Sequence, residues 1–210
     1  MDITGEKTIV EYISGIEKRS IVLQEGASLK ALFIVQDADL TIDVVTQGER
    51  SKATVSCVFL SKKWSKVAAS VQGTLQASHS AIDLYLLSLL GEQAECNIDG
   101  WIVIAPDIVK TSGHLLEENI VLWKKVKIKT LPMLDVRSAD VNASHGAKID
   151  RLDENKLFYM MAKGLDQKQS QMLIVQWYIE RLCDELHRND DAEKEQIISQ
   201  ILEYLDMRSL

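Results

Sequence analysis

The chain has 210 residues, of which 46% are hydrophobic, and a formal net charge of −7 at pH 7. This apolar content is enough for a sizeable core, while the acidic balance disfavours non-specific nucleic-acid binding, which needs a basic face. No apolar run reaches the roughly 18 residues of a membrane-spanning helix, and residues 1–7 lack the apolar stretch of a secretory signal. The three cysteines form no C-x-x-C pair, so we expect a reduced, cytoplasmic protein that does not enter a membrane.

The chain up to about residue 143 favours β-structure. Apolar residues near Ile9–Ile13 and Ile21–Leu23 suggest short strands, and from Ala27 onward Val, Ile, Leu and Thr alternate over short windows. The later predicted strands are Leu29–Val35, Leu40–Val45, Ala53–Leu60, Val67–Leu75, Ile82–Leu90, Ala94–Ile104, Ile120–Leu122, Val126–Lys129 and Leu134–Val136. Short strands without crossover helices admit a sandwich, a barrel or a β-solenoid, and composition alone does not choose among them.

The last quarter of the chain predicts three helices. Asp153 can cap a helix that runs to Lys163 and ends at Gly164, and Asp166 can cap a second helix that runs to His187. Asn189-Asp190 can cap a third. Each later helix has an apolar face, which can dock on the β body of the chain or on a partner.

The four residues Ser144-His145-Gly146-Ala147 belong to a longer series of motifs. Asp140 precedes them, and Asp153-Glu154, Phe158-Tyr159 and Lys163-Gly164 follow in order. This series resembles the core domain shared by SufB and SufD, the scaffold proteins of the SUF iron–sulfur cluster assembly system, and the resemblance extends over roughly Ile21–Leu186. It implies a mainly β fold, in which a right-handed parallel β-helix forms domain 1–150 and a helical segment forms residues 151–210.

His145 is the residue that the resemblance marks for chemistry. In SufD the matching histidine faces the SufB partner and is associated with nascent cluster binding, and a neutral imidazole is a competent iron ligand. We expect His145 to project from an exposed turn as an iron or cluster ligand; a surface histidine bonded to Ser144 or Asp140 is the alternative. SufB carries a cysteine near Glu117 and an acid after its histidine, so Glu117 and Gly146 make this chain more similar to SufD, with Glu117 as a second candidate ligand.

The cysteines are weaker ligand candidates than His145. Cys57, Cys96 and Cys183 lie among apolar residues, which is typical of core packing. No P-loop or hydrolase motif is present, so we expect neither nucleotide binding nor enzymatic activity.

The resemblance implies a scaffold subunit for iron–sulfur cluster biogenesis. Such a subunit carries a transient cluster or iron, pairs with a SufB-like subunit or with itself near Leu116–Val141, and docks a SufC-like ABC ATPase through its C-terminal helices. The aromatic residues Phe158, Tyr159, Trp177 and Tyr178 are the predicted anchors for the ATPase. The alternative function is a carbohydrate-binding or carbohydrate-active β-solenoid, against which the low aromatic content of 6% and the missing signal weigh.

Overall fold

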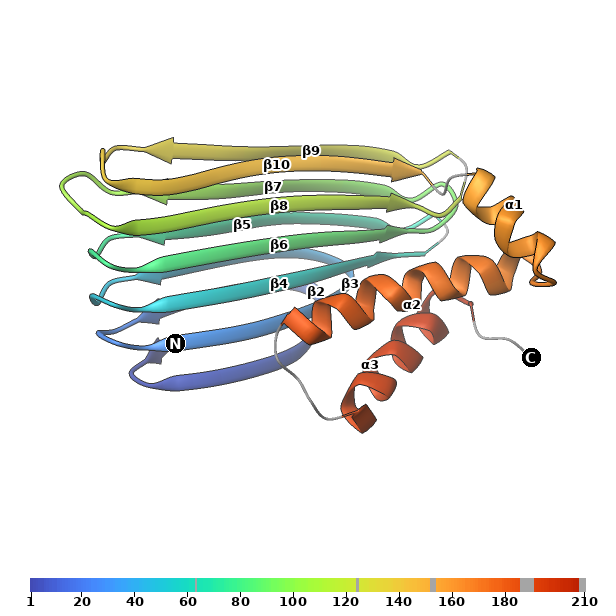
Figure 1. Ribbon diagram of the computed structural model, residues 1–210, viewed down its shortest axis with the longest axis horizontal. Helices are drawn as coiled ribbons and strands as arrows, with labels where there is room; N and C mark the ends of the chain where they lie inside the picture. Colours follow the sequence, from blue (N-terminus) through green and yellow to red (C-terminus); the bar gives the residue numbers. More distant parts are fainter. Residues whose placement is uncertain (63, 124, 152–153, 186–190, 208–210) are drawn as a thin grey trace.

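The structure is a computed structural model that describes residues 1–62, 64–123, 125–151, 154–185 and 191–207. Within these ranges ten strands precede three helices (Figure 1). The strands are β1 (Asp2–Ile3), β2 (Glu6–Leu23), β3 (Ser28–Thr46), β4 (Lys52–Ser61), β5 (Lys66–Leu75), β6 (Ala81–Leu90), β7 (Glu95–Ile104), β8 (Thr111–Val121), β9 (Lys127–Val136) and β10 (Val141–Arg151). The helices are α1 (Glu154–Ala162), α2 (Gln167–Glu185) and α3 (Asp191–Tyr204).

The strands form one parallel sheet that is wound into a flattened solenoid. The order is β10-β8-β6-β4-β3-β5-β7-β9, so from β4 onward strands that follow one another in the chain lie on opposite walls. Strand β3 links the two walls, because Ser28–Gln36 pairs with β4 and Asp39–Thr46 pairs with β5. We call the wall of β4, β6, β8 and β10 the front wall and that of β5, β7 and β9 the back wall (Figure 1). The prediction of a parallel β-helix is confirmed.

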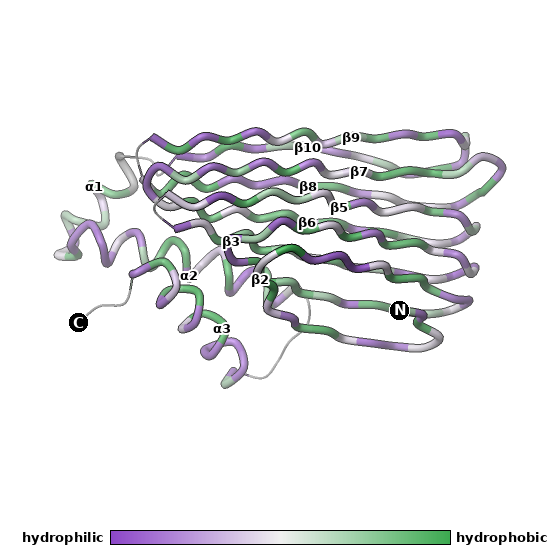
Figure 2. Tube along the Cα trace, turned by 180° about the vertical axis from the view of Figure 1, so that it is seen from behind, coloured by the Kyte–Doolittle hydropathy of each residue, from purple (hydrophilic) through white to green (hydrophobic). Residues whose placement is uncertain are grey.

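Two apolar clusters hold the fold together. The first fills the solenoid with alternate side chains from both walls, among them Phe33, Phe59 and Ile82. The second lies on the outer side of the front wall, where α2 and α3 cover it. Strands β4 and β6 are therefore buried on both sides and are nearly continuously apolar, whereas hydropathy alternates along the back-wall strands (Figure 2).

Strand β10 corrects the expectation for residues 144–147. These residues were predicted to form a turn, but they lie in the middle of β10, whose residues pair one to one with Thr111–Val121 of β8. The turn prediction was wrong because β10 is an edge strand that is exposed along much of its length, so it lacks the apolar alternation that marks buried strands. Strands β8 and β9 are likewise longer than predicted.

The three predicted helices are present. Gly164 has φ +94°, the left-handed conformation expected after α1. The backbone N–H of Gln169 donates to Asp166 Oδ1 at 2.7 Å, and Gln169 Oε1 accepts from the backbone N–H of Asp166 at 2.8 Å, which forms a capping box. The predicted caps Asp153 and Asn189-Asp190, and His187, lie outside the described residues. No helix in the described ranges has the length and apolar character to cross a membrane.

Candidate functional site

His145 lies at the open end of the solenoid. On β10 it is opposite Leu115, a buried interior residue, whereas the preceding Ser144 is opposite the outward-facing His114. Because side chains alternate along a strand, His145 is on the interior side of β10. Strand β10 ends the order of the sheet, so this interior side is exposed at His145.

Glu117 lies on the same interior side, on the adjacent strand. It is opposite Ala147, two positions along from the partner of His145, and is 1% exposed. The Thr130 hydroxyl donates to its carboxylate, and Glu117 Oε1 lies against Gly100, where a Cβ atom would come within 2.4 Å. Burial raises the pKa of the Glu117 carboxyl, and the Thr130 hydrogen bond partly opposes this. The structure thus brings together the two predicted ligands at the last coil.

The three cysteines are buried, as their apolar surroundings predicted. Cys57 is in the interior cluster, where burial raises the pKa of its thiol, and Cys183 is in the cluster under α2. Cys96 Sγ lies 3.6 Å from Ser88 Oγ, and burial with the nearby Glu117 charge raises the pKa of Cys96 to about 11. The Cys96 thiol therefore stays protonated at neutral pH, which makes it a poor ligand.

A row of polar side chains crosses the outer side of the front wall. His114 Nδ1 is 2.8 Å from Ser144 Oγ, and Asp83 is opposite His114 on the next strand. Burial raises the pKa of Asp83, and the charge of His114 partly opposes this. A shallow depression of about 380 Å³ beside Thr54 contains these groups. This row could not be predicted from the sequence, because its members are far apart in the chain and meet only through strand register.

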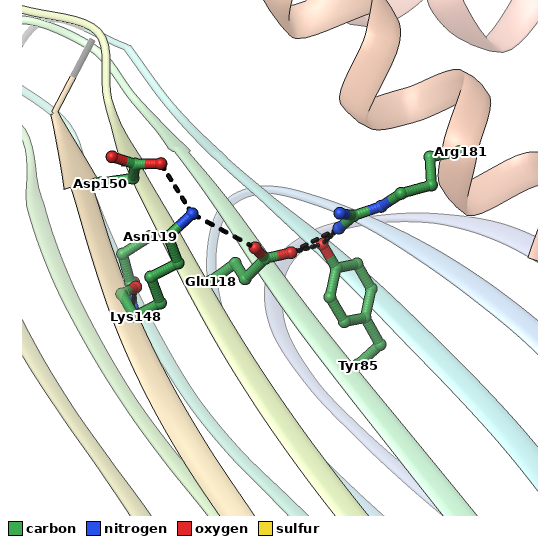
Figure 3. A network of polar contacts seen from close by, with 6 residues as sticks. All are labelled: Tyr85, Glu118, Asn119, Lys148, Asp150 and Arg181. Carbon is green, nitrogen blue, oxygen red and sulfur yellow. Dashed lines mark hydrogen bonds and ion pairs between the residues drawn. The ribbon is translucent and has the colours of Figure 1, made fainter. Parts of the chain in front are cut away.

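A charged cluster fastens α2 to the front wall (Figure 3). Glu118 accepts hydrogen bonds from Tyr85 and Arg181, and its other oxygen is 4.0 Å from Lys148 Nζ on β10. Lys148 also pairs with Asp150 at 2.8 Å. The Glu118 side chain is 8% exposed, so it relies on these partners for its charge. The two neighbouring residues therefore point to opposite sides of β8: Glu117 lies inside the solenoid, and Glu118 lies outside it and contacts α2.

The four predicted anchor aromatics differ in exposure. Phe158 and Tyr159 on α1 are 74% and 64% exposed, and Trp177 on α2 is 54% exposed. Tyr178 is 7% exposed and packs in the cluster between α2 and the front wall. Its ring therefore holds α2 on the β body, and the other three rings face outward.

Among the residues that the structure describes, no three His, Cys, Asp or Glu side chains gather as a metal site. His145 and Glu117 are two ligands at most, which is fewer than iron usually takes. Among the described residues, these two side chains would therefore leave coordination positions of an iron ion open.

Comparisons with known proteins agree with this architecture. Residues 11–177 match the family model described as "SUF system FeS cluster assembly, SufBD core domain". The iron–sulfur cluster assembly protein SufD of Escherichia coli K12 is 27% identical over 114 residues, which are 54% of this chain and 26% of that protein. A SufBD family protein of Synechocystis is 26% identical over 53% of this chain and 25% of its own length, and one of Pyrococcus horikoshii is 30% identical over 40% and 19%. The matched part thus spans about a quarter or less of each relative.

Proposed function

Because the chain belongs to the SufBD core family of the SUF iron–sulfur cluster assembly system, we propose that it is a scaffold subunit that presents His145 to iron or a nascent cluster at the open end of its β-helix. One observation carries the proposal: His145 and Glu117 share the interior side of adjacent strands at the last coil. The cluster is the cargo of this subunit and is passed on after assembly. The family match also favours this role over carbohydrate binding.

The two ligands have different parts in this proposal. The exposed imidazole of His145 can bind iron when neutral, without a change in the fold. Glu117 is buried and burial raises its pKa, so its carboxylate form is harder to reach than that of an exposed glutamate, and a metal binds the carboxylate form. Glu117 is therefore a secondary ligand, which a metal ion would recruit after it has bound His145.

A partner supplies the remaining ligands. The outer edges of β9 and β10 have unpaired backbone groups at the end of the sheet, and such edges favour pairing with another chain. The partner is a SufB-like subunit or a second copy of this chain. Sedimentation at tens of micromolar should detect a homodimer if its interface reaches about 1,200 Å². A strict monomer there would leave the SufB-like subunit as the partner.

The exposed aromatics of α1 and α2 are the proposed contact for a SufC-like ABC ATPase. Phe158, Tyr159 and Trp177 offer large apolar areas, and such side chains anchor protein interfaces. The change Phe158→Ala with Tyr159→Ala should weaken capture of the ATPase at least tenfold. Trp64→Ala is the matched control, because Trp64 is 71% exposed in the connection between β4 and β5. Equal losses in both variants would contradict the contact.

Complementation tests the role of His145. In a strain of the source organism that lacks its own copy, His145→Ala should lower function sharply, and His114→Ala should keep it. His114 is the matched control because it lies on the outer side of the same wall. Full function in the His145→Ala strain would mean that the ligands come from the partner alone.

A further inference from the structure

The two ends of the solenoid differ in what their interior side carries. The first long strand, β2, runs along both walls and bends at Gly15, which has φ +82°. On its interior side lie Glu11, Glu17 and Arg19, opposite the buried core residues Phe33, Leu40 and Ile42 of β3. Three charged side chains of β2 therefore occupy interior positions that are apolar on the adjacent strand β3.

These three side chains form one ion cluster across the mouth of the first coil. Arg19 Nε donates to Glu11 Oε1 at 3.0 Å, and Arg19 Nη1 donates to Glu17 Oε2 at 2.7 Å. Glu11 stands on the front-wall part of β2, and Arg19 stands on the back-wall part. The side chains of all three are 31–43% exposed, so the cluster covers the core with groups that stay in contact with water.

Within the part of the chain that the structure describes, the other end has no such cluster. The interior positions of β9 and β10 include Thr130, Pro132, Ala143 and Ala147, beside His145. Among the described residues, the ion pairs near this end join outward positions; they are Lys127–Glu95, Lys148–Glu118, Lys148–Asp150 and Arg137–Asp135. A second solenoid thus meets mostly uncharged interior groups here, and the exceptions are His145 and Arg151, which is opposite Val121 at the end of β10.

Strand direction makes head-to-tail stacking geometrically possible. Every neighbouring pair in the sheet is parallel, so β10 of one copy could add the β2 edge of the next copy in the same mode. Such a contact is heterologous and does not close, so it would propagate into a filament. It would also bury Glu11, Arg19 and Glu17, with their net negative charge, against a coil whose interior positions are mostly uncharged, and the desolvation cost opposes that.

We propose that the Glu11–Arg19–Glu17 cluster is an end cap that prevents copies of this chain from stacking head to tail. Inward-pointing charges are a known means of protecting sheet edges, and repeat proteins need polar outer faces on their terminal repeats. The cap leaves the β9–β10 end available for pairing. This inference does not depend on the proposed function.

The test replaces the cluster by apolar and small β-forming residues, as Glu11→Val, Arg19→Val and Glu17→Thr together. We expect the folded triple variant to form filaments at tens of micromolar, seen by electron microscopy and by a sedimenting mass that rises with concentration. If the apolar variant does not fold, the variant with glutamine at all three positions, which keeps the shapes of the two glutamate side chains and removes all three charges, should form the same filaments. The control Asp135→Val with Arg137→Val removes an exposed ion pair near the other end and should keep the wild-type mass.

Two additions distinguish stacking from general aggregation. Ala143→Lys with Ala147→Lys places charge on the interior side of β10 and should abolish the filaments of the triple variant. A small fraction of wild-type chain, mixed with the triple variant, should shorten the filaments. A wild-type copy can join a filament through its β10, but its β2 still carries the charged cluster, so no further copy can add there. A folded triple variant with the wild-type mass, or filaments that persist with both lysines present, would overturn the proposal.

Discussion

At the scale of single residues, the carboxyl group of Glu117 packs directly against the backbone of Gly100 inside the solenoid. Glu117 was identified through the resemblance, but its burial and its contact with Gly100 follow from strand register. Nothing in the local sequence separates Glu117 from the neighbouring Glu118, although they face opposite sides of the wall. Single-residue function here is set by pairing between distant segments.

Gly100→Ala tests this contact. A Cβ at residue 100 would come within 2.4 Å of Glu117 Oε1 and within 2.9 Å of a Leu115 methyl group, so the substitution should destabilise the fold by about 1–3 kcal/mol. Gly146→Ala is the control, because nothing lies within 4 Å of its Cβ position. Urea denaturation of both variants measures the difference, and equal stabilities would show that Glu117 moves aside without cost.

Glu117→Gln tests the electrostatic part. Burial raises the pKa of Glu117 in the folded chain above its unfolded value, so the folded state binds the proton more tightly. That contribution to stability is complete below the unfolded pKa and is lost as pH rises through the folded pKa. The glutamine variant should therefore exceed the wild type in free energy of unfolding at pH 7, by a margin that shrinks toward pH 4. A margin that does not change with pH would refute the raised pKa.

At the scale of elements, helices were easier to predict than the last strands. The residue types alone predicted that Asp166 begins α2 as its N-cap and that Gly164 ends α1, and both features are present. Strand β10 was missed because its partner β8 is remote in sequence and its solvent-exposed face removes the apolar alternation. The apolar runs of β4 and β6 have their explanation in α2 and α3, which cover them. Cutting off the helices would expose that surface, so substitutions are better tests than truncation.

The attachment of α2 should depend on Arg181. Arg181→Met leaves Glu118 buried with one cation fewer, which we expect to cost about 2 kcal/mol, below the value for a fully buried pair because Arg181 is about one-third exposed. Adding Glu118→Gln should recover part of that loss, as a double-mutant cycle by urea denaturation would show. Strict additivity of the two changes would mean that the pair is not coupled. If proteolysis within α2 and α3 is faster in the Arg181→Met variant than in the double variant, the loss of stability lies in the attachment of these helices.

At the scale of the whole molecule, the solenoid became recognisable through the family resemblance and not through a repeat. The register partners Ser28, Lys52, Ala81 and Ser112 are unevenly spaced along the chain, so no fixed period marks the coils. The completed fold has a charged cluster at one end and His145 with Glu117 at the other. This polarity supports the proposal that pairing and cargo share the same end.

The central claim is that this end holds iron or a cluster. The most direct measurement is the iron and acid-labile sulfide content of the complex, purified anaerobically after co-expression of the chain with its ATPase and any SufB-like partner. We expect His145→Ala to lower both by most of their wild-type value at unchanged subunit composition, and His145→Ala with Glu117→Ala to remove the remainder. His114→Ala should keep both at the wild-type level. Full iron and sulfide in the His145→Ala complex would contradict the account.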